Sequence, residues 1–244
     1  MTTINSPRAT GRRSPHPPFP ALRKLFRLTI AAGTTFALAV LLTTLGSLTA
    51  TRADTGSVAN AGVDAGNSPM AVTQNMVNHA LQIMANKSLP VRERRRQLRE
   101  AIENEFDFSE MSRSALGYHW RGLGPDDRSQ FTQLFTAFIE DAYLSKIQDY
   151  SGQQVRFDGQ TPLGQGYTQI NTNIVEPGKN PITVNYLLLQ KGDTWKIYDV
   201  TVDAISIIAN YRNQFNRVIN EKGFPQLMVD LRAKQQELAS LLNG

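Results

Sequence analysis

The sequence predicts an α+β domain in which helices cover a four-stranded antiparallel sheet. Three observations support this fold class. Apolar residues recur at helical spacing from about residue 70 to 150, alternate with polar residues from about 155 to 202, and return to helical spacing after 205. Short turns separate the alternating stretches, so neighbouring strands are antiparallel. Helices, then strands, then helices is an α+β order.

The first 53 residues are predicted to be an export signal. They contain seven basic residues and no acid, an apolar run from residue 28 to about 50, and a small-residue exit with cleavage at Ala53. An uncleaved membrane anchor is the alternative, because the run approaches the roughly 20 residues that a spanning helix needs. Small polar residues in 54–69 indicate a flexible linker, which leaves 70–244 as the folded domain.

Composition excludes several classes of function. Without residues 1–53 the chain has 19 basic and 21 acidic residues, a net charge of about −2, so its basic character gives no argument for nucleic-acid binding. The absence of cysteine removes disulfides, thiolate metal sites and cysteine nucleophiles. Because only His79 and His119 remain, a metal site built on imidazoles is not expected. We expect no metal and no cofactor.

Capping signals predict where the helices begin and end. Ser88 is the expected N-cap of a second helix, after one that begins near Met70. Asp107 and Glu110 match a capping box, with Asp107 as the cap and Glu110 reaching back to it. Gly117 is suited to the left-handed conformation that ends the short helix. A further helix with a wide aromatic stripe begins at Pro125, and a helix that includes Ile205 is followed by another after Gly223.

Four strands are predicted between residues 155 and 202, and each has an apolar face. The apolar positions are Val155 and Phe157; Ile170, Thr172 and Ile174; Ile182, Val184, Tyr186 and Leu188; and Trp195, Ile197, Val200 and Val202. The helices offer more apolar surface than such a sheet requires. This pattern fits both a fully packed core and an apolar cavity between sheet and helices, the usual form of a small-molecule site.

Few residues carry recognisable chemistry. No serine-hydrolase, metalloprotease or phosphate-loop motif is present. Asp199 and Asp203, with Tyr198, form the one acid-base arrangement that a small enzyme with an apolar pocket would use. Capping of the next helix by these aspartates is the commoner arrangement.

An arginine-rich stretch lies on the second predicted helix. Its basic residues are expected on the face opposite the apolar stripe, either as a solvated surface or as a docking patch for an acidic partner or anionic headgroups. They are Arg92, Arg94, Arg95, Arg96 and Arg99.

Six separated motifs carry a resemblance to a known family. They are Phe106-Asp107-Phe108 with Glu110-Met111; Ala115-Leu116-Gly117 with Trp120; Phe131-Thr132-Gln133-Leu134-Phe135; Tyr150-Ser151-Gly152-Gln153; Trp195-Lys196-Ile197-Tyr198-Asp199-Val200; and Tyr211-Arg212-Asn213-Gln214-Phe215. Gly223-Phe224 and Leu231-Arg232-Ala233-Lys234 extend the match. In this order the chain resembles the MlaC-type phospholipid-binding proteins, also called the toluene-tolerance auxiliary family.

The resemblance implies a periplasmic phospholipid carrier that is not an enzyme. Such a carrier moves lipid between an outer-membrane lipoprotein complex and an inner-membrane ABC transporter complex, and we expect a monomer whose cargo is its only ligand. The implied fold is a twisted four-stranded sheet with acyl chains between sheet and helices. Some relatives occur with hopanoid-synthesis genes, so a hopanoid is an alternative cargo. The third hypothesis is a structural envelope module that binds only protein, through the arginine-rich helix.

Residue roles follow as expectations. The lipid-binding wall is expected to include Phe138, Tyr143, Val155, Phe157, Tyr186, Leu188, Trp195, Ile197 and Ile208. Structural or mouth-forming roles are expected for Trp120, Tyr198, Asp199, Tyr211 and Arg212.

Overall fold

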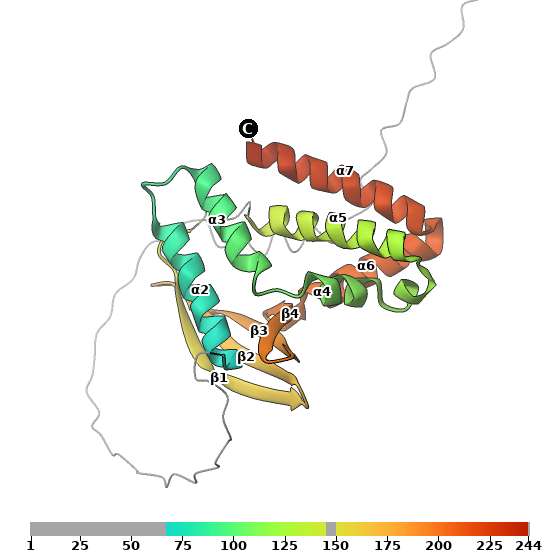
Figure 1. Cartoon of the computed structure of the whole chain (residues 1–244). Coiled ribbons are helices and arrows are strands. Elements are labelled where there is room, and N and C mark those ends of the chain that lie inside the picture. Colours follow the sequence, from blue (N-terminus) through green and yellow to red (C-terminus); the bar gives the residue numbers. More distant parts are fainter. Residues whose placement is uncertain (1–66, 145–149, 244) are drawn as a thin grey trace, which may run out of the picture. The chain divides into compact units, whose positions relative to one another are not determined.

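The structure, a computed structural model, describes residues 67–144 and 150–243 (Figure 1). The expected export signal, 1–53, and most of the expected linker lie outside the described residues. The first described helix, α2, spans Pro69–Ala85, close to its predicted start. None of the helices in the described ranges combines the length and apolarity needed to cross a membrane.

The helices that precede the sheet are set by their caps. They are α3 (Val91–Glu103), α4 (Phe108–Leu116), the 3-10 helix η1 (Gly117–Gly122) and α5 (Pro125–Leu144). Asp107 caps α4 as predicted, because its carboxylate accepts a hydrogen bond from the Glu110 N–H at 3.0 Å. Gly117 ends α4 with φ of +57°, a conformation that costs glycine little.

Two predicted caps are wrong in detail. Pro90 occupies the N-cap position of α3, and the Ser88 hydroxyl donates to the Asn86 side chain instead. The Glu110 side chain does not return to the α4 cap. It accepts two hydrogen bonds from Arg113, because that residue lies one turn further along the same face.

The sheet has five strands, in the order β1-β2-β3-β4-β5, and all neighbours are antiparallel. They are β1 (Gln154–Gly164), β2 (Tyr167–Val175), β3 (Ile182–Lys191), β4 (Thr194–Val202) and β5 (Ile205–Ser206). The prediction of four strands was wrong, because the sheet also contains the short strand β5. Asp203 and Ala204 adopt φ of +48° and +64° and turn the chain back along β4, so Ile205 pairs with Val202 before the next helix begins.

A bulge in β4 keeps its apolar residues on one face. Leu188 pairs with Ile197 and Leu187 pairs with Asp199, which leaves Tyr198 as the extra residue. Without this bulge, Ile197 and Val200 would point to opposite faces of the sheet. With it, both lie on the same face as Leu188 and Tyr186.

Two helices follow the sheet, α6 (Ile207–Lys222) and α7 (Phe224–Asn243). The Ser206 hydroxyl caps α6 by accepting from the Ala209 N–H at 2.9 Å. Figure 1 shows α7 running along α5, and contacts join α5, α6 and α7 into one helical layer. Its interior is aromatic, with edge-on and stacked ring contacts among Phe131, Phe135, Phe138, Tyr211 and Phe215. Helix α2 covers β1 and β2, while α4 and α6 contact β4.

Candidate functional site

One face of the sheet is apolar across its width. The strand register places the inner-face residues of the four long strands opposite one another. The apolar ones are Val155, Phe157, Ile170, Ile174, Ile182, Val184, Tyr186, Leu188, Trp195, Ile197, Val200 and Val202, and the buried Thr168 and Thr172 lie on the same face. Six of the nine predicted wall residues lie on this face: Val155, Phe157, Tyr186, Leu188, Trp195 and Ile197.

Helix α2 covers only part of this face. Its residues Val72, Met76 and Val77 form a buried cluster with Ile170, Leu188 and Ile197, which have no accessible surface. Other residues of the same face stay only half-buried around that cluster: Val155, Phe157, Tyr186, Trp195 and Val200. Leu188 and Ile197 therefore contact α2 in this structure, and the half-buried set provides the accessible apolar surface.

Two tyrosines combine accessible surface with a desolvated hydroxyl. Tyr143, on α5, keeps 42% of its surface accessible, yet burial raises the pKa of its hydroxyl and the Asp199 carboxylate raises that pKa further. On the inner face of β3, burial raises the pKa of Tyr186 to about 12. Burial is the main cause that raises the pKa of Tyr211, and the Tyr143 hydroxyl raises that pKa further. Tyr143, near the end of α5, therefore lies within electrostatic reach of Asp199 on β4 and of Tyr211 on α6.

The remaining wall candidates lie in packed surroundings. Phe138 is buried in the aromatic layer, with its ring centroid 5.5 Å from that of Tyr211. Ile208 is buried at the start of α6, where its N–H donates to the Asp199 carboxylate at 3.1 Å. Neither belongs to the half-buried set.

The acids that an enzyme would use are engaged by backbone and cap groups. The Asp199 carboxylate accepts from the N–H of Val200, from the N–H of Ile208 and from the Ser206 hydroxyl. Burial raises its pKa, while those hydrogen bonds oppose the rise. Asp203 accepts from the Thr183 N–H at 3.1 Å. Asp199 thus fixes the turn between β4 and α6, and its bond to the Ile208 N–H is of the helix-capping kind.

The expected mouth residues separate into two groups. Trp120 and Arg212 lie together in a surface pocket of about 320 Å³ between α4, η1 and α6. Tyr198, Asp199 and Tyr211 do not line that pocket, and Tyr198 contacts Tyr167 edge-on at 5.7 Å instead. The complete lining is Arg113, Ser114, Gly117, Tyr118, Trp120, Arg121 and Arg212. Sequence reasoning missed Arg113 and Arg121, although basic residues on both sides of a helix-ending glycine were a usable signal.

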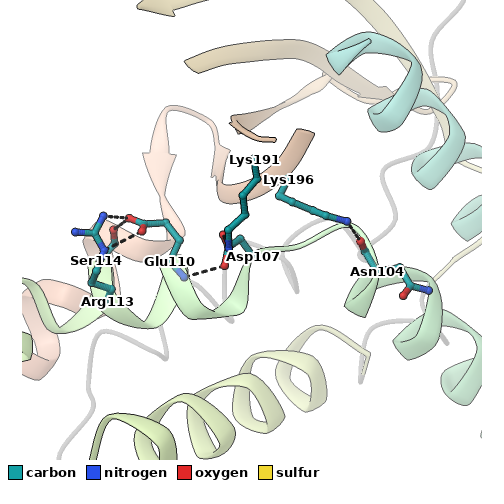
Figure 2. A network of polar contacts seen from close by, with 7 residues as sticks. All are labelled: Asn104, Asp107, Glu110, Arg113, Ser114, Lys191 and Lys196. Carbon is teal, nitrogen blue, oxygen red and sulfur yellow. Dashed lines mark hydrogen bonds and ion pairs between the residues drawn. The ribbon is translucent and has the colours of Figure 1, made fainter. Parts of the chain in front are cut away.

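A polar network connects the start of α4 to the β3–β4 hairpin (Figure 2). Lys191 donates to the Asp107 carboxylate at 2.6 Å, and Lys196 donates to the Asn104 carbonyl. The Asp107 N–H also donates to the Ile197 carbonyl at 2.8 Å, so the segment before α4 extends the β4 edge. Further along α4, Glu110 holds Arg113 (Figure 2). One wall of the basic pocket is therefore fixed to the sheet.

The arginines of α3 are not all on a solvated face, contrary to expectation. Arg94 is buried and donates to the Met84 carbonyl at 3.1 Å, and Arg95 donates to the Leu242 carbonyl. Arg99 bridges to Glu140 at 3.0 Å and to Asp141 at 2.7 Å on α5. These contacts arise because α3 packs between neighbouring helices, which gives its polar face internal partners. Arg92 and Arg96 are exposed.

Comparison with known proteins gives concordant matches. The family model described as MlaC protein matches residues 74–233. The intermembrane phospholipid transport system binding protein MlaC of Haemophilus influenzae is 26% identical over 130 residues, which are 51% of this chain and 58% of that protein. The match thus spans less than two thirds of that relative.

A solved structure shares the fold. It is the phospholipid-binding protein from Ralstonia solanacearum in complex with a phospholipid, with a TM-score of 0.63 and 20% identity. The likeness covers 69% of this chain and 97% of that one. It confirms the predicted α+β class, with an antiparallel sheet wrapped by helices.

Proposed function

Because the chain belongs to the MlaC family, we propose that it is a periplasmic carrier of phospholipid. In this proposal the carrier receives lipid from one membrane and delivers it to the other, with an outer-membrane lipoprotein complex and an inner-membrane ABC transporter complex as its partners. The observation that supports it best is the incompletely covered apolar face of the sheet. A hopanoid is the alternative cargo.

The half-buried inner-face residues fit the wall of an acyl-chain cavity. Val155, Phe157, Tyr186 and Trp195 keep apolar surface that α2 does not cover. Tyr143, which keeps 42% of its surface accessible, and the half-buried Tyr186 add a second observation, because burial raises the pKa of both hydroxyls although neither side chain is fully buried. We place the acyl chains between this face and the end of α5.

Burial of acyl chains is sufficient to retain a lipid, and it requires no catalytic group. At about 0.8 kcal/mol per buried CH₂, an acyl chain of roughly 15 methylenes gains on the order of ten kcal/mol when it leaves water. An apolar wall therefore retains a lipid, and its transfer requires only an acceptor of similar apolarity. The family is one of lipid-binding transport proteins. The enzyme alternative, with Asp199 and Tyr198, has less support because three donors already occupy the Asp199 carboxylate.

Lipid extraction tests the proposal. The protein is purified without detergent, extracted with organic solvent, and the extract is identified and quantified by mass spectrometry. We expect about one phospholipid per protein, and a hopanoid in that amount would reassign the cargo. An extract without lipid, from protein that is folded by circular dichroism, would contradict a carrier and favour an enzyme or a protein-binding module.

A further inference from the structure

The pocket between α4, η1 and α6 is basic and aromatic. Three guanidinium groups line it, from Arg113, Arg121 and Arg212, together with the rings of Tyr118 and Trp120. No acidic side chain is among its lining residues. Its volume of about 320 Å³ lies at the lower end of the range for small-molecule sites, about 300 to 1,000 Å³.

Hydrogen bonds fix η1 against α6 and thereby fix the pocket. The Tyr118 hydroxyl donates to the Asn220 side chain at 2.9 Å, and His119 pairs with Asn216 at 2.9 Å. Arg128 donates to the Trp120 carbonyl at 3.1 Å, and its guanidinium lies 5.5 Å from the Trp120 ring centroid. The aromatic wall is therefore set in place before any ligand arrives.

Gly117 brings Arg212 into the pocket. A Cβ at position 117 would lie 3.3 Å from Cδ of Arg212, closer than side chains ordinarily approach, and φ of +57° also favours glycine. The glycine thus lets the Arg212 side chain cross the end of α4. This close approach places a guanidinium from α6 beside residues of α4 and η1.

The arginines of the pocket differ in their partners. Arg113 is held by Glu110 through two hydrogen bonds, of 2.7 and 2.8 Å. Within the described ranges, neither Arg121 nor Arg212 forms an ion pair with an acidic side chain. Arg212 attracts Asp199 electrostatically, but three other donors occupy that carboxylate. Neither of these two guanidinium groups is therefore bound directly to a carboxylate of the described residues.

We propose that this pocket binds a phosphate group, with Arg121 and Arg212 as the ligands that hold it. Guanidinium groups offer paired donors that match phosphate oxygens, and charge-assisted hydrogen bonds of this kind are strong. The phosphate belongs either to a lipid headgroup or to a free phosphate ion. The site is separate from the apolar face of the sheet, so it does not require that the protein carry lipid.

The two tryptophans of the chain report on the two sites independently. Trp120 lines the basic pocket, whereas Trp195 lies on the apolar face of the sheet. In a Trp195→Phe background, we would titrate the purified protein with glycerol phosphate, with inorganic phosphate, and with sodium chloride at matched ionic strength. In a Trp120→Phe background, a long-chain monoacylglycerol tests the apolar face without any phosphate.

Trp120 emission should change saturably with the phosphate compounds and not with chloride. Adding Arg121→Gln and Arg212→Gln should weaken binding at least about tenfold, because both charge-assisted pairs are lost. Arg217→Gln, an exposed arginine of α6 outside the pocket, is the matched control. Tighter binding of glycerol phosphate assigns the site to a headgroup, and tighter binding of inorganic phosphate assigns it to the free ion.

Three results would overturn the phosphate site: no saturable response, an equal response to chloride, or equal affinity in the double variant and in Arg217→Gln. A Trp195 response to monoacylglycerol alongside any of these would leave the carrier proposal standing. A saturable Trp120 response to the phosphate compounds, without a Trp195 response to monoacylglycerol, would support the phosphate site and contradict the carrier proposal.

Discussion

Val155 and Arg156 are neighbours in β1 with opposite surroundings. Val155 is half-buried on the inner face, whereas Arg156 is exposed on the outer face and pairs with Asp158. Val155→Trp should fill the proposed acyl-chain space and lower copurifying lipid several-fold, while Arg156→Trp serves as the matched control on the same strand. Lipid per protein, measured by mass spectrometry on variants with similar melting curves, checks this. Equal lipid content in the two variants would remove Val155 from the wall.

Leu188 has no accessible surface and packs against α2, in contrast to the half-buried wall residues. Leu188→Ala should lower the free energy of unfolding by about 2 to 5 kcal/mol, because it leaves a cavity in a packed cluster. Leu163→Ala, at a side chain 48% exposed on β1, should change it by less than about 0.5 kcal/mol. Urea denaturation followed by circular dichroism measures both. A small loss at Leu188 would indicate that the cluster under α2 is loosely packed.

The contact between α3 and α5 predicts a pH dependence of stability. Burial raises the pKa of Glu140 from 4.5 to about 7, although Arg99 opposes the rise from 3.0 Å. Between pH 4.5 and 7 the folded protein holds a proton on Glu140 that the unfolded chain has released. The stability that this bound proton contributes is fully present below about pH 4.5 and is lost as pH rises through 7.

The Glu140→Gln variant isolates this effect. Between pH 5 and pH 8 the unchanged protein should lose on the order of 2 kcal/mol of unfolding free energy relative to the variant, because the neutral amide cannot titrate. Urea denaturation across this range measures the difference. Parallel pH profiles for the two proteins would show that Glu140 keeps its charge in the folded state.

The arginines of α3 lie in different environments, so their substitutions should have different effects on lipid transfer and on stability. We expect removal of the exposed charges, by Arg92→Gln with Arg96→Gln, to slow lipid transfer to anionic vesicles at low ionic strength and to leave bound lipid unchanged. Arg94→Gln is the contrasting variant, because loss of its bond to the Met84 carbonyl should cost about 1 to 3 kcal/mol of stability. Transfer of a fluorescent lipid at two salt concentrations provides the measurement. A transfer rate that the double variant leaves unchanged at low salt would make this face an ordinary solvated surface.

Export of the whole chain is predicted to remove residues 1–53. Expression in a bacterium with two membranes should yield a soluble periplasmic protein that begins at Asp54, because the acid-free basic start, the apolar run and the small residue at position 53 form one signal. Ala53→Leu should block or shift cleavage, since the exit requires a small residue. Intact-mass spectrometry of both fractions gives the answer. A full-length chain in the membrane fraction would identify the segment as an anchor.

Local patterns were sufficient for the order and limits of most elements. Asp107, Gly117 and Gly223 stand at helix boundaries as predicted, because a cap or a left-handed residue acts within one turn of its own position. Alternation identified the inner face of β1, β2 and β3 for the same reason, since side-chain direction along a regular strand has a fixed period, whereas the bulge at Tyr198 interrupts that period in β4. The family motifs added the class of ligand, which no single residue of this chain specifies.

Contacts between distant segments determined the remainder. The Tyr198 bulge and β5 depend on how β4 meets its neighbours, and the internal partners of Arg94 and Arg99 depend on how α3 packs. The basic pocket brings Arg113 and Arg121 close to Arg212, which lies about ninety positions further along the chain. Their proximity depends on how α6 packs against η1. Such contacts between distant residues depend on strand register and helix orientation, which follow from the packing of the entire core and not from any local pattern.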